Sequence, residues 1–340
     1  MQTVAIVGLG YFSQFHQAAW DANADAELVA VADLDLSRAQ QIADTYGARA
    51  FSDPVEMADE LDPAIIDLVV PPVVHADLIR KLLRPGRTII CQKPFCTSPD
   101  EARAVAQDAK TAGVTLVIHE NFRFQPWHRT TKSLLESGKL GHVHNAYFTV
   151  RPGDGRGPDA YLSRQPSFQR MPRFLIQETV VHQMDTLQYL LGPVTSVYAD
   201  LTQINPAISG EDAGIVILTH KSGAKSIIDG NRHLDHIAKD RRRTMGELTI
   251  EGENGTVSLN GDGALSFRAF DTNTVTPVEL TAPVDTTTFG GGCVAALISH
   301  VVDCTKTGKT PENTALEYLG VMKLVEAAYQ SAKEARKIDL

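Results

Sequence analysis

The sequence feature that most constrains the fold is a glycine motif placed directly after the first strand-like run. The apolar run Val4–Val7 leads into Gly8–Ser13, a Gly-x-Gly-x-x-Ser motif with serine where the third glycine usually stands. Gly8 and Gly10 allow a tight turn and a close approach of the backbone to a pyrophosphate, which the N-terminus of a following helix also attracts. The alternative is a plain glycine turn in an α/β domain without a nucleotide, and the position between strand and helix favours the dinucleotide site.

Short apolar runs alternate with amphipathic stretches over the first 120 residues. Runs rich in Val and Ile, typical of buried parallel strands, occur at 4–7, 28–32, 65–70, 88–91 and 114–118, with a weaker one at 48–51. Two of the stretches between them begin with capping signals, Asp53 with Glu56 and Ser98 with Glu101. The alternation predicts an α/β fold, a doubly wound parallel sheet of the Rossmann type, over residues 1–121.

Asp33 ends the second apolar run, about 20 residues after the glycine motif, where an acid can bind the ribose hydroxyls. A carboxylate there accepts hydrogen bonds from a 2′-hydroxyl and repels a 2′-phosphate. The nearest cation is Arg38, one turn into the next helix. NAD is therefore favoured over NADP; the alternative is that Asp33 only caps a helix.

From about residue 122 the pattern changes to strands separated by turn residues, which predicts mainly antiparallel pairing. The expected strands are 142–150, 194–202, 213–219, 224–229, 247–251, 256–260 and 265–270, and the expected closing helices are 294–306 and 312–336. We therefore expect a second, α+β domain over residues 122–340, with an open, mainly antiparallel sheet that binds substrate and carries oligomer contacts.

A helix expected over 174–191 carries polar side chains along one side. At about 100° per residue, Glu178, His182, Asp185 and Tyr189 lie close together, and apolar residues occupy the opposite side. His182 can take a proton near neutral pH, and a carboxylate one turn away can orient it. The alternative is a solvated helix face with pairing between residues four apart.

The segment 151–173 has little regular pattern and holds five arginines against two aspartates, in a chain whose net charge is −9. Loops of this length usually have a function or are disordered. Arginine forks suit carboxylates and phosphates, which indicates an acidic sugar substrate. The alternative is that these arginines pair with acidic groups of the body or of another subunit.

Composition excludes several classes of protein. With 43% hydrophobic and 21% charged residues the chain is an ordinary globular protein, and its acidic balance argues against nucleic acid or an anionic membrane as partner. No apolar run approaches the roughly 20 residues that span a bilayer, and no signal peptide is recognisable. The four cysteines are sparse, and no metal-ligand spacing occurs, so we expect buried thiols, no metal site and a cytoplasmic location.

The segment Gln92–Pro94, Gln-Lys-Pro in sequence, resembles the Glu-Lys-Pro motif of the Gfo/Idh/MocA family of NAD(P)-dependent sugar and cyclitol dehydrogenases. Pro71–His75 is similar to the family's cofactor-flanking loop, and Asn121–Pro126 is similar to its Asn-x-Arg-x-x-Pro crossover into the second domain. Thr307–Pro311 and the closing helix resemble its C-terminal segment. The resemblance therefore covers nearly the whole chain.

The resemblance implies an NAD(P)-dependent dehydrogenase acting on CH–OH groups, with hydride transfer between the nicotinamide and a secondary hydroxyl or ketone of a sugar, sugar acid or cyclitol. Lys93 would be catalytic, beside the nicotinamide, and would support the charge on the reacting oxygen. The family's Asp-x-Gly-x-His-x-x-Asp motif matches the expected helix, with Glu178 and Val180 in place of the first Asp and the Gly. His182 is then the expected base, and Glu178 orients it or contacts the substrate.

The expected partners are a small carbohydrate or polyol and other copies of the chain, because the family's open sheet is commonly covered by another subunit in a homodimer or homotetramer. Two alternatives keep the same fold: an NAD-dependent glycosidase that uses transient oxidation, and a non-catalytic NAD or sugar sensor. The expected cofactor-binding residues are Gly8, Gly10, Tyr11, Phe12, Asp33, Pro72, His75, Gln92, Lys93 and Asn121. The expected substrate-binding residues are Arg123, Arg156, Tyr161, Arg164 and Asp185.

Overall fold

A computed structural model describes all 340 residues, which form two compact units. Unit 1 contains residues 1–121 and 294–320, and unit 2 contains residues 122–293 and 321–340. The sequence assigned the whole of 122–340 to the second domain, whereas 294–320 packs with the first. Helix α8 (Cys293–Thr307) makes this connection: the Lys306 ammonium lies 2.7 Å from a carboxylate oxygen of Asp25, in a part of the chain far away in sequence.

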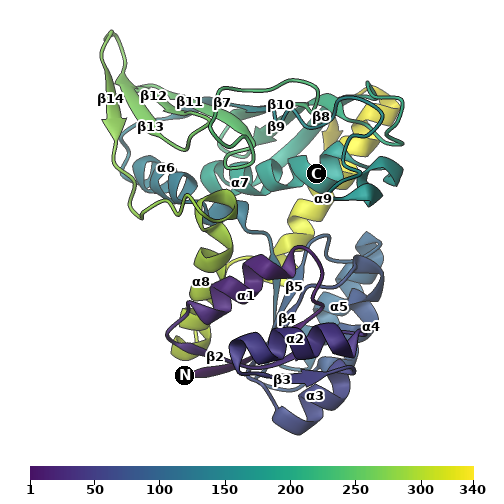
Figure 1. The fold of residues 1–340 in the computed structure, drawn as a ribbon. Coiled ribbons are helices and arrows are strands. Elements are labelled where there is room, and N and C mark those ends of the chain that lie inside the picture. Colours follow the sequence, from purple (N-terminus) through teal and green to yellow (C-terminus); the bar gives the residue numbers. More distant parts are fainter. The chain divides into compact units, whose positions relative to one another are not determined.

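Unit 1 is built on a six-stranded parallel sheet in the order β3-β2-β1-β4-β5-β6, which confirms the predicted fold class (Figure 1). Its strands are β1 (Gln2–Val7), β2 (Ala26–Ala32), β3 (Arg49–Phe51), β4 (Ile65–Leu68), β5 (Thr88–Gln92) and β6 (Thr115–His119). Its remaining helices are α1 (Ser13–Asp21), α2 (Leu36–Tyr46), α3 (Pro54–Leu61), α4 (His75–Leu82) and α5 (Pro99–Thr111). The central strands are almost entirely buried, because helices cover both faces of such a sheet.

The predicted caps start two helices of unit 1, α3 and α5. The Asp53 carboxylate accepts hydrogen bonds from the first free backbone N–H groups of α3, at 2.7 Å from Val55 N. Ser98 Oγ accepts from Glu101 N at 3.2 Å, and Glu101 reaches back to the N–H of Thr97. Caps of this kind stabilise a helix by about 1 kcal/mol each and fix where it starts on the sheet.

Unit 2 contains a nine-stranded sheet in the order β14-β13-β12-β11-β7-β10-β9-β8-β15. All neighbours are antiparallel except β10 and β7, so the sheet is mixed but mainly antiparallel, as predicted. Its strands are β7 (Val143–Val150), β8 (Val194–Thr202), β9 (Ala213–His220), β10 (Lys225–Asn231), β11 (Gly246–Gly252), β12 (Gly255–Leu259), β13 (Leu265–Ala269), β14 (Val275–Val278) and β15 (Ile338–Asp339).

The two outermost strands of this sheet were not predicted. β14 is exposed and contains Pro277, which cannot donate to a ladder and is tolerated only at an edge. β15 is two residues long and carries no periodic signal. Helices α6 (Pro126–Glu136) and α7 (Val181–Leu191) lie along one face of the sheet in Figure 1, and α9 (Ala315–Glu334) ends in this unit.

None of the helices combines the length and the apolar character needed to cross a lipid bilayer. The four cysteines are all buried and none forms a disulfide. Burial raises the pKa of the Cys96 thiol to about 12, so this thiol is not a reactive thiolate at neutral pH. No group of three or more His, Cys, Asp or Glu side chains is arranged to hold a metal ion.

Candidate active site

The glycine motif forms the turn between β1 and α1, and glycine is required at its two positions for different reasons. Gly8 has a φ of +90°, and a Cβ at this position would lie 2.5 Å from the carbonyl oxygen of Val69. Gly10 has no heavy atom within 4 Å of its added Cβ, so its backbone is open to a ligand. Ser13, in place of a third glycine, is buried and donates from Oγ to the Gly10 carbonyl at 2.7 Å. The turn is therefore closed on the protein side and open where a pyrophosphate approaches.

A pocket of about 830 Å³ lies against this turn, within unit 1. This volume is in the range of small-molecule and cofactor sites. Residues from five strand ends and the loops after them line it, among them Gly10, Phe12, Asp33, Arg38, Val70 and Gln92. An open glycine turn, an acid at the end of β2 and the N-terminus of α1 together fit a dinucleotide.

Asp33 is held at the pocket wall by backbone donors. Its Oδ2 accepts from Leu9 N at 2.8 Å, and its Oδ1 accepts from Asp35 N at 2.9 Å. The Arg38 guanidinium is 3.5 Å from the same carboxylate. A carboxylate offers about four lone-pair sites, so two remain for ribose hydroxyls. The geometry fits the predicted role of Asp33 and shows that its carboxylate also fixes the glycine turn.

The other predicted cofactor residues have different surroundings. Tyr11 is exposed and Phe12 half-buried, and both line the pocket. Pro72 is half-buried in the loop after β4. His75 is fully buried, with its ring nitrogens 2.8 Å from the carbonyl oxygens of Phe95 and Val70. Burial lowers the pKa of His75, and the hydrogen bonds to these two carbonyl oxygens oppose that shift. The ring therefore lies between the loop after β4 and the chain after β5.

Gln92 and Lys93 stand at the end of β5. Gln92 lines the pocket, and its Oε1 accepts from Lys93 N at 2.8 Å. Asn121, after β6, is buried, and its Nδ2 has no hydrogen-bond partner in the structure. A buried amide donor left open at the end of the sheet fits a residue that awaits a ligand.

The segment with the expected base departs from a regular α-helix. Residues Leu175–Val180 form a π-helical turn, which continues as α7 from Val181. The expectation of one α-helix over 174–191 is corrected here: because the π turn is wider than an α turn, Glu178 is not on an ideal 100° stripe with His182. Such turns occur frequently at functional sites. His182 is 7% exposed and Asp185 is fully buried, so neither belongs to a solvated helix face.

The imidazole of His182 stacks on a ring that the sequence analysis missed. Phe122 lies parallel to it, with ring centroids 4.1 Å apart and planes inclined by 8°. The ring of Phe289 is tilted against Phe122, with centroids 6.0 Å apart. The stack fixes the plane of the imidazole, and a base needs a fixed plane if it is to meet a hydroxyl proton from one direction. Phe122 lies next to Asn121 in the crossover motif, and this position in the sequence could have identified it as a site residue.

Two predicted substrate residues pair with each other. Arg123 donates from Nε and a terminal nitrogen to both carboxylate oxygens of Asp185, at 2.9 and 2.5 Å. The Arg123 side chain is 4% exposed and the Asp185 side chain is fully buried, so both partners of the pair are removed from water. Tyr189, on the same side of α7, has its ring 5.3 Å from the Arg123 guanidinium and accepts a hydrogen bond from Arg129 at 2.7 Å. This bidentate pair attaches α7 to the crossover segment, and substrate contact by either residue stays a prediction.

Tyr161 and Arg164 converge on Asp154, which the sequence analysis did not select. Tyr161 Oη and an Arg164 nitrogen each lie 3.2 Å from an Asp154 oxygen. Arg232, 2% exposed, also binds this carboxylate at 2.9 Å, beneath the ring of Phe174. Burial alone would raise the pKa of Asp154, but the charges and hydrogen bonds of the arginines outweigh it and lower that pKa.

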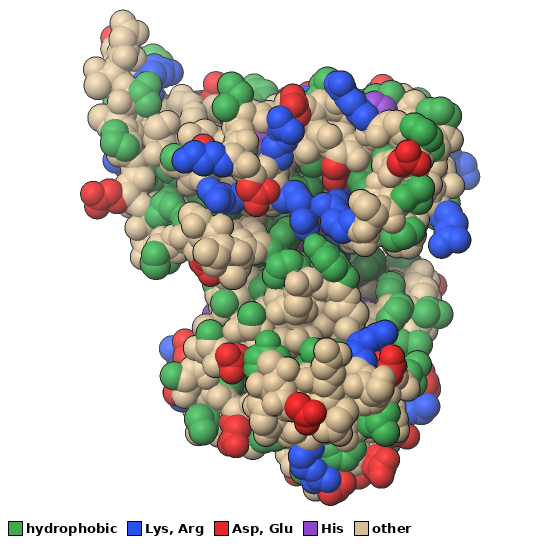
Figure 2. All heavy atoms as spheres, in the orientation of Figure 1, with side chains coloured by type: hydrophobic (Ala, Val, Ile, Leu, Met, Phe, Trp, Pro, Cys, Tyr) green, Lys and Arg blue, Asp and Glu red, His purple; other side chains and the backbone are tan.

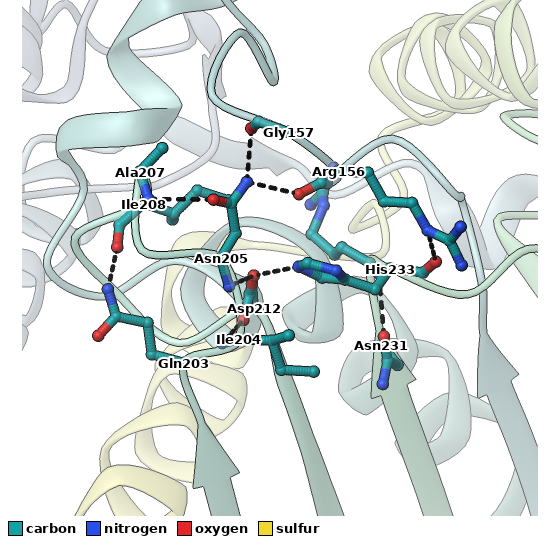
Figure 3. A network of polar contacts seen from close by, with 12 residues as sticks. Arg156, Gly157, Gln203, Ile204, Asn205, Ala207, Ile208, Asp212, Asn231 and His233 are labelled. Atoms are coloured by element: carbon teal, nitrogen blue, oxygen red, sulfur yellow. Dashed lines mark hydrogen bonds and ion pairs between the residues drawn. The ribbon is translucent and has the colours of Figure 1, made fainter.

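Arg156 is the predicted substrate arginine that stays exposed. Its Nε donates to the carbonyl of His233 at 2.7 Å, and Figure 3 shows its guanidinium turned away from Asp212. Asn205 holds the loop by donating to the carbonyls of Gly155 and Gly157, both at 2.8 Å. The fully buried Asp212 in turn binds His233 at 2.9 Å. The loop is thus rigidly attached while the end of Arg156 faces solvent.

Intramolecular pairing accounts for three of the five arginines of 151–173. Arg151 pairs with Asp229, Arg164 with Asp154, and Arg173 with Glu326. Figure 2 shows lysine and arginine side chains gathered on the visible face of unit 2, in the upper part of the view. The pairing alternative therefore explains most of this segment. Arg156 and Arg170 remain exposed, and of these only Arg156 was predicted to bind substrate.

The strand order of unit 1, the open glycine turn and the acid at the end of β2 define a dinucleotide-binding Rossmann domain. Comparison with protein families agrees: residues 2–120 match the model "Oxidoreductase family, NAD-binding Rossmann fold", and residues 128–258 match "GFO/IDH/MocA C-terminal domain". The chain belongs to the Gfo/Idh/MocA oxidoreductase family.

Individual relatives extend this assignment. The chain is 31% identical to the D-apiose dehydrogenase of Paraburkholderia graminis, over 99% of this chain and 89% of that protein. It is 29% identical to the inositol 2-dehydrogenase of Rhizobium meliloti, over 77% of this chain and 76% of that protein. Among solved structures it is similar to an oxidoreductase from Agrobacterium radiobacter in complex with NAD+, L-tartaric acid and magnesium, with a TM-score of 0.90, 27% identity and coverage of 99% and 98%.

These findings confirm the family, the class of enzyme and the cofactor that the sequence predicted. The protein is an NAD-binding oxidoreductase, a dehydrogenase of the class that acts on CH–OH groups. The roles of individual residues stay predictions.

Cofactor choice gives the first testable prediction. Asp33→Ala is expected to weaken NAD binding by roughly tenfold, because a charge-assisted hydrogen bond contributes about 1.5–3 kcal/mol, and to affect NADP much less. Thermal-shift titrations with both cofactors measure the difference between the affinities for NAD and for NADP. Asp33→Asn is the control, because it keeps an acceptor for Leu9 N but removes the charge. Equal affinity of the unmodified protein for NAD and NADP would contradict the role of Asp33.

Proposed function

We propose that this enzyme transfers hydride between NAD and a secondary hydroxyl or ketone carbon of a sugar, sugar acid or cyclitol. The observation that carries the proposal is the similarity to a D-apiose dehydrogenase over 99% of this chain, together with Gln92 in the wall of the cofactor pocket and Lys93 next to it in the chain. Inositol 2-dehydrogenases among the relatives widen the substrate class from sugars to cyclitols.

The chain's own residues supply the proton chemistry in this proposal. His182 accepts the hydroxyl proton, with its imidazole plane held by Phe122. Lys93 hydrogen-bonds the same oxygen and stabilises the charge that develops there. Glu178 orients His182 or contacts the substrate. Bound NAD supplies the hydride acceptor at C4 of the nicotinamide.

The alternative of an NAD-dependent glycosidase predicts glycoside cleavage without net NADH, and a sensor predicts binding without turnover. A substrate panel separates the three. We expect NADH formation with neutral sugars or cyclitols, D-apiose and the inositols being the first to test. A panel without NADH formation from any sugar, sugar acid or cyclitol would contradict the proposed function.

The same panel tests substrate charge. If an aldonate or uronate is oxidised with a higher kcat/KM than its neutral parent, Arg156→Gln is expected to remove that advantage and leave the neutral parent unaffected. The expectation follows from the exposed guanidinium of Arg156, which can bind a carboxylate. Turnover of neutral compounds alone would exclude the acidic-substrate hypothesis.

We also propose a homodimer or homotetramer acting in the cytoplasm. One sheet face of unit 2 carries helices, and the other carries an apolar row in which Tyr147, Ile227, Ile217 and Tyr198 are in register across β7, β10, β9 and β8. Tyr147 and Tyr198 are exposed, at 39% and 37%. A row of this kind on an open sheet is suited to a second copy of the chain.

A further inference from the structure

Beneath Gln92, unit 1 contains a buried polar cluster to which no role has yet been given. It consists of His16 from α1, Asp67 from β4 and His119 from β6, together with Trp20. Asp67 and His16 are fully buried, and His119 is 1% exposed. A charged residue in the middle of a buried strand of a parallel sheet is costly, so the cluster needs an explanation.

The hydrogen bonds run in one direction through the cluster. Lys93 N–H can only donate, so the Gln92 atom 2.8 Å from it is the amide oxygen. The Gln92 Nε2 then faces His16 Nε2 at 3.1 Å and donates to it. Because His16 Nε2 accepts, the ring proton is on Nδ1, which donates to Asp67 Oδ2 at 2.7 Å.

Trp20 and His119 make further hydrogen-bond contacts at the two ends of this series of hydrogen bonds, at Asp67 and at Gln92. Trp20 Nε1, which is only a donor, also points at Asp67 Oδ2 at 2.7 Å, so Asp67 is an acceptor with both groups. The second proton of the Gln92 amide points toward His119 Nδ1 at 3.5 Å, at the limit of hydrogen bonding. The rings of His16 and His119 lie 4.2 Å apart. An amide at position 92 therefore donates toward two imidazoles, which a carboxylate cannot do.

We propose that Asp67, His16 and His119 are positioning residues that hold the Gln92 amide in one orientation and thereby place Lys93 for hydride transfer. The proposal explains why this chain carries glutamine where the family's motif has glutamate: a carboxylate at position 92 would require a second proton on His16, whose Nδ1 proton already binds Asp67. It rests on the proposed function, because placement of Lys93 is useful only if Lys93 contacts the reacting oxygen.

The first experiment measures the tautomer and requires no substrate. In the ¹⁵N-histidine-labelled protein at neutral pH, the His16 signal, identified by its absence in His16→Leu, is expected to report a proton on Nδ1 only. Asp67→Asn is expected to change this signal, since an asparagine can donate as well as accept and releases the constraint on the ring. A proton on Nε2 of His16 in the unmodified protein would overturn the proposal, whatever the enzyme oxidises.

The second experiment measures turnover. His16→Leu leaves Gln92 without its acceptor and is expected to lower kcat by about ten- to a hundredfold, because small displacements of a catalytic group are that costly. NAD affinity is expected to change less than about threefold, since the pocket wall is intact. Trp20→Phe is the matched control: it removes one donor from the same Asp67 oxygen and is expected to lower the melting temperature with kcat within about twofold. Equal losses of kcat in the two variants would indicate a purely structural cluster.

The pH dependence of kcat in Gln92→Glu is a measurement that a purely structural role of the cluster would leave unchanged. The groups facing position 92 and His16 are Asp67 from β4, His119 from β6 and Lys93 from β5. Glutamate restores the chain of hydrogen bonds only when His16 carries a proton on both ring nitrogens, so kcat relative to the unmodified enzyme is expected to rise as pH falls. A pH-independent ratio would contradict the proposal. A protein that shows the expected tautomer but oxidises no sugar or cyclitol would contradict the proposed function and not the hydrogen-bond chain.

Discussion

His182→Ala is expected to lower kcat by at least about 100-fold, because loss of a general base typically costs 10²–10⁴-fold. NAD affinity is expected to stay unchanged, since the pocket that fits the cofactor is formed by unit 1 and His182 belongs to unit 2. The loss should therefore fall on kcat and on kcat/KM for the substrate. Steady-state kinetics on the best substrate of the panel, with NAD titrated separately, measure both.

Two further measurements separate a base from a structural residue. In the direction of alcohol oxidation the rate is expected to rise with pH, because a base must be unprotonated to accept the hydroxyl proton, and this pH limb should be absent in His182→Ala. Glu178→Gln is expected to cost less than His182→Ala if Glu178 orients the imidazole, and as much if Glu178 accepts the proton itself. Phe122→Leu, which removes the stacked ring, should reduce kcat without abolishing the pH limb. Near-normal turnover of His182→Ala would exclude the mechanism.

Asp185→Ala is expected to destabilise the fold by about 3–5 kcal/mol, because removing one partner of a buried ion pair takes a compensating charge away from the other partner. Here the remaining charge is Arg123, which is almost fully buried and loses both of its bonds to the carboxylate. The free energy of unfolding, from denaturant titration, measures the loss.

Two controls make this result specific. Glu60→Ala removes one partner of an ion pair of 2.7 Å in which both side chains are about half exposed, and should cost no more than about 1 kcal/mol. The double variant Arg123→Met with Asp185→Leu removes both charges together and should recover much of the loss. A loss below about 1 kcal/mol in Asp185→Ala would show that Arg123 finds other compensation, and the pair would then be free to serve a ligand.

The features that the sequence predicted correctly depend on residues close together in the chain. A run of β-branched residues forms a strand, Gly8 permits the turn that follows it, and Asp53 satisfies the N–H groups two and three positions ahead. The fold class, the cofactor and the family follow from such local signals, because their order along the chain already specifies a doubly wound sheet.

Other features of the site depend on contacts between distant residues, and only the tertiary structure determined them. Arg123 and Asp185 are 62 positions apart, His16 and Asp67 are 51 apart, and Arg232 and Asp154 are 78 apart. The sequence showed charges suited to a substrate, but it did not show that several of them neutralise one another. The physical reason is that local conformation is set by neighbouring dihedral preferences and caps, whereas the partner of a buried charge is whichever group the packing of sheets and helices brings within about 3 Å of it.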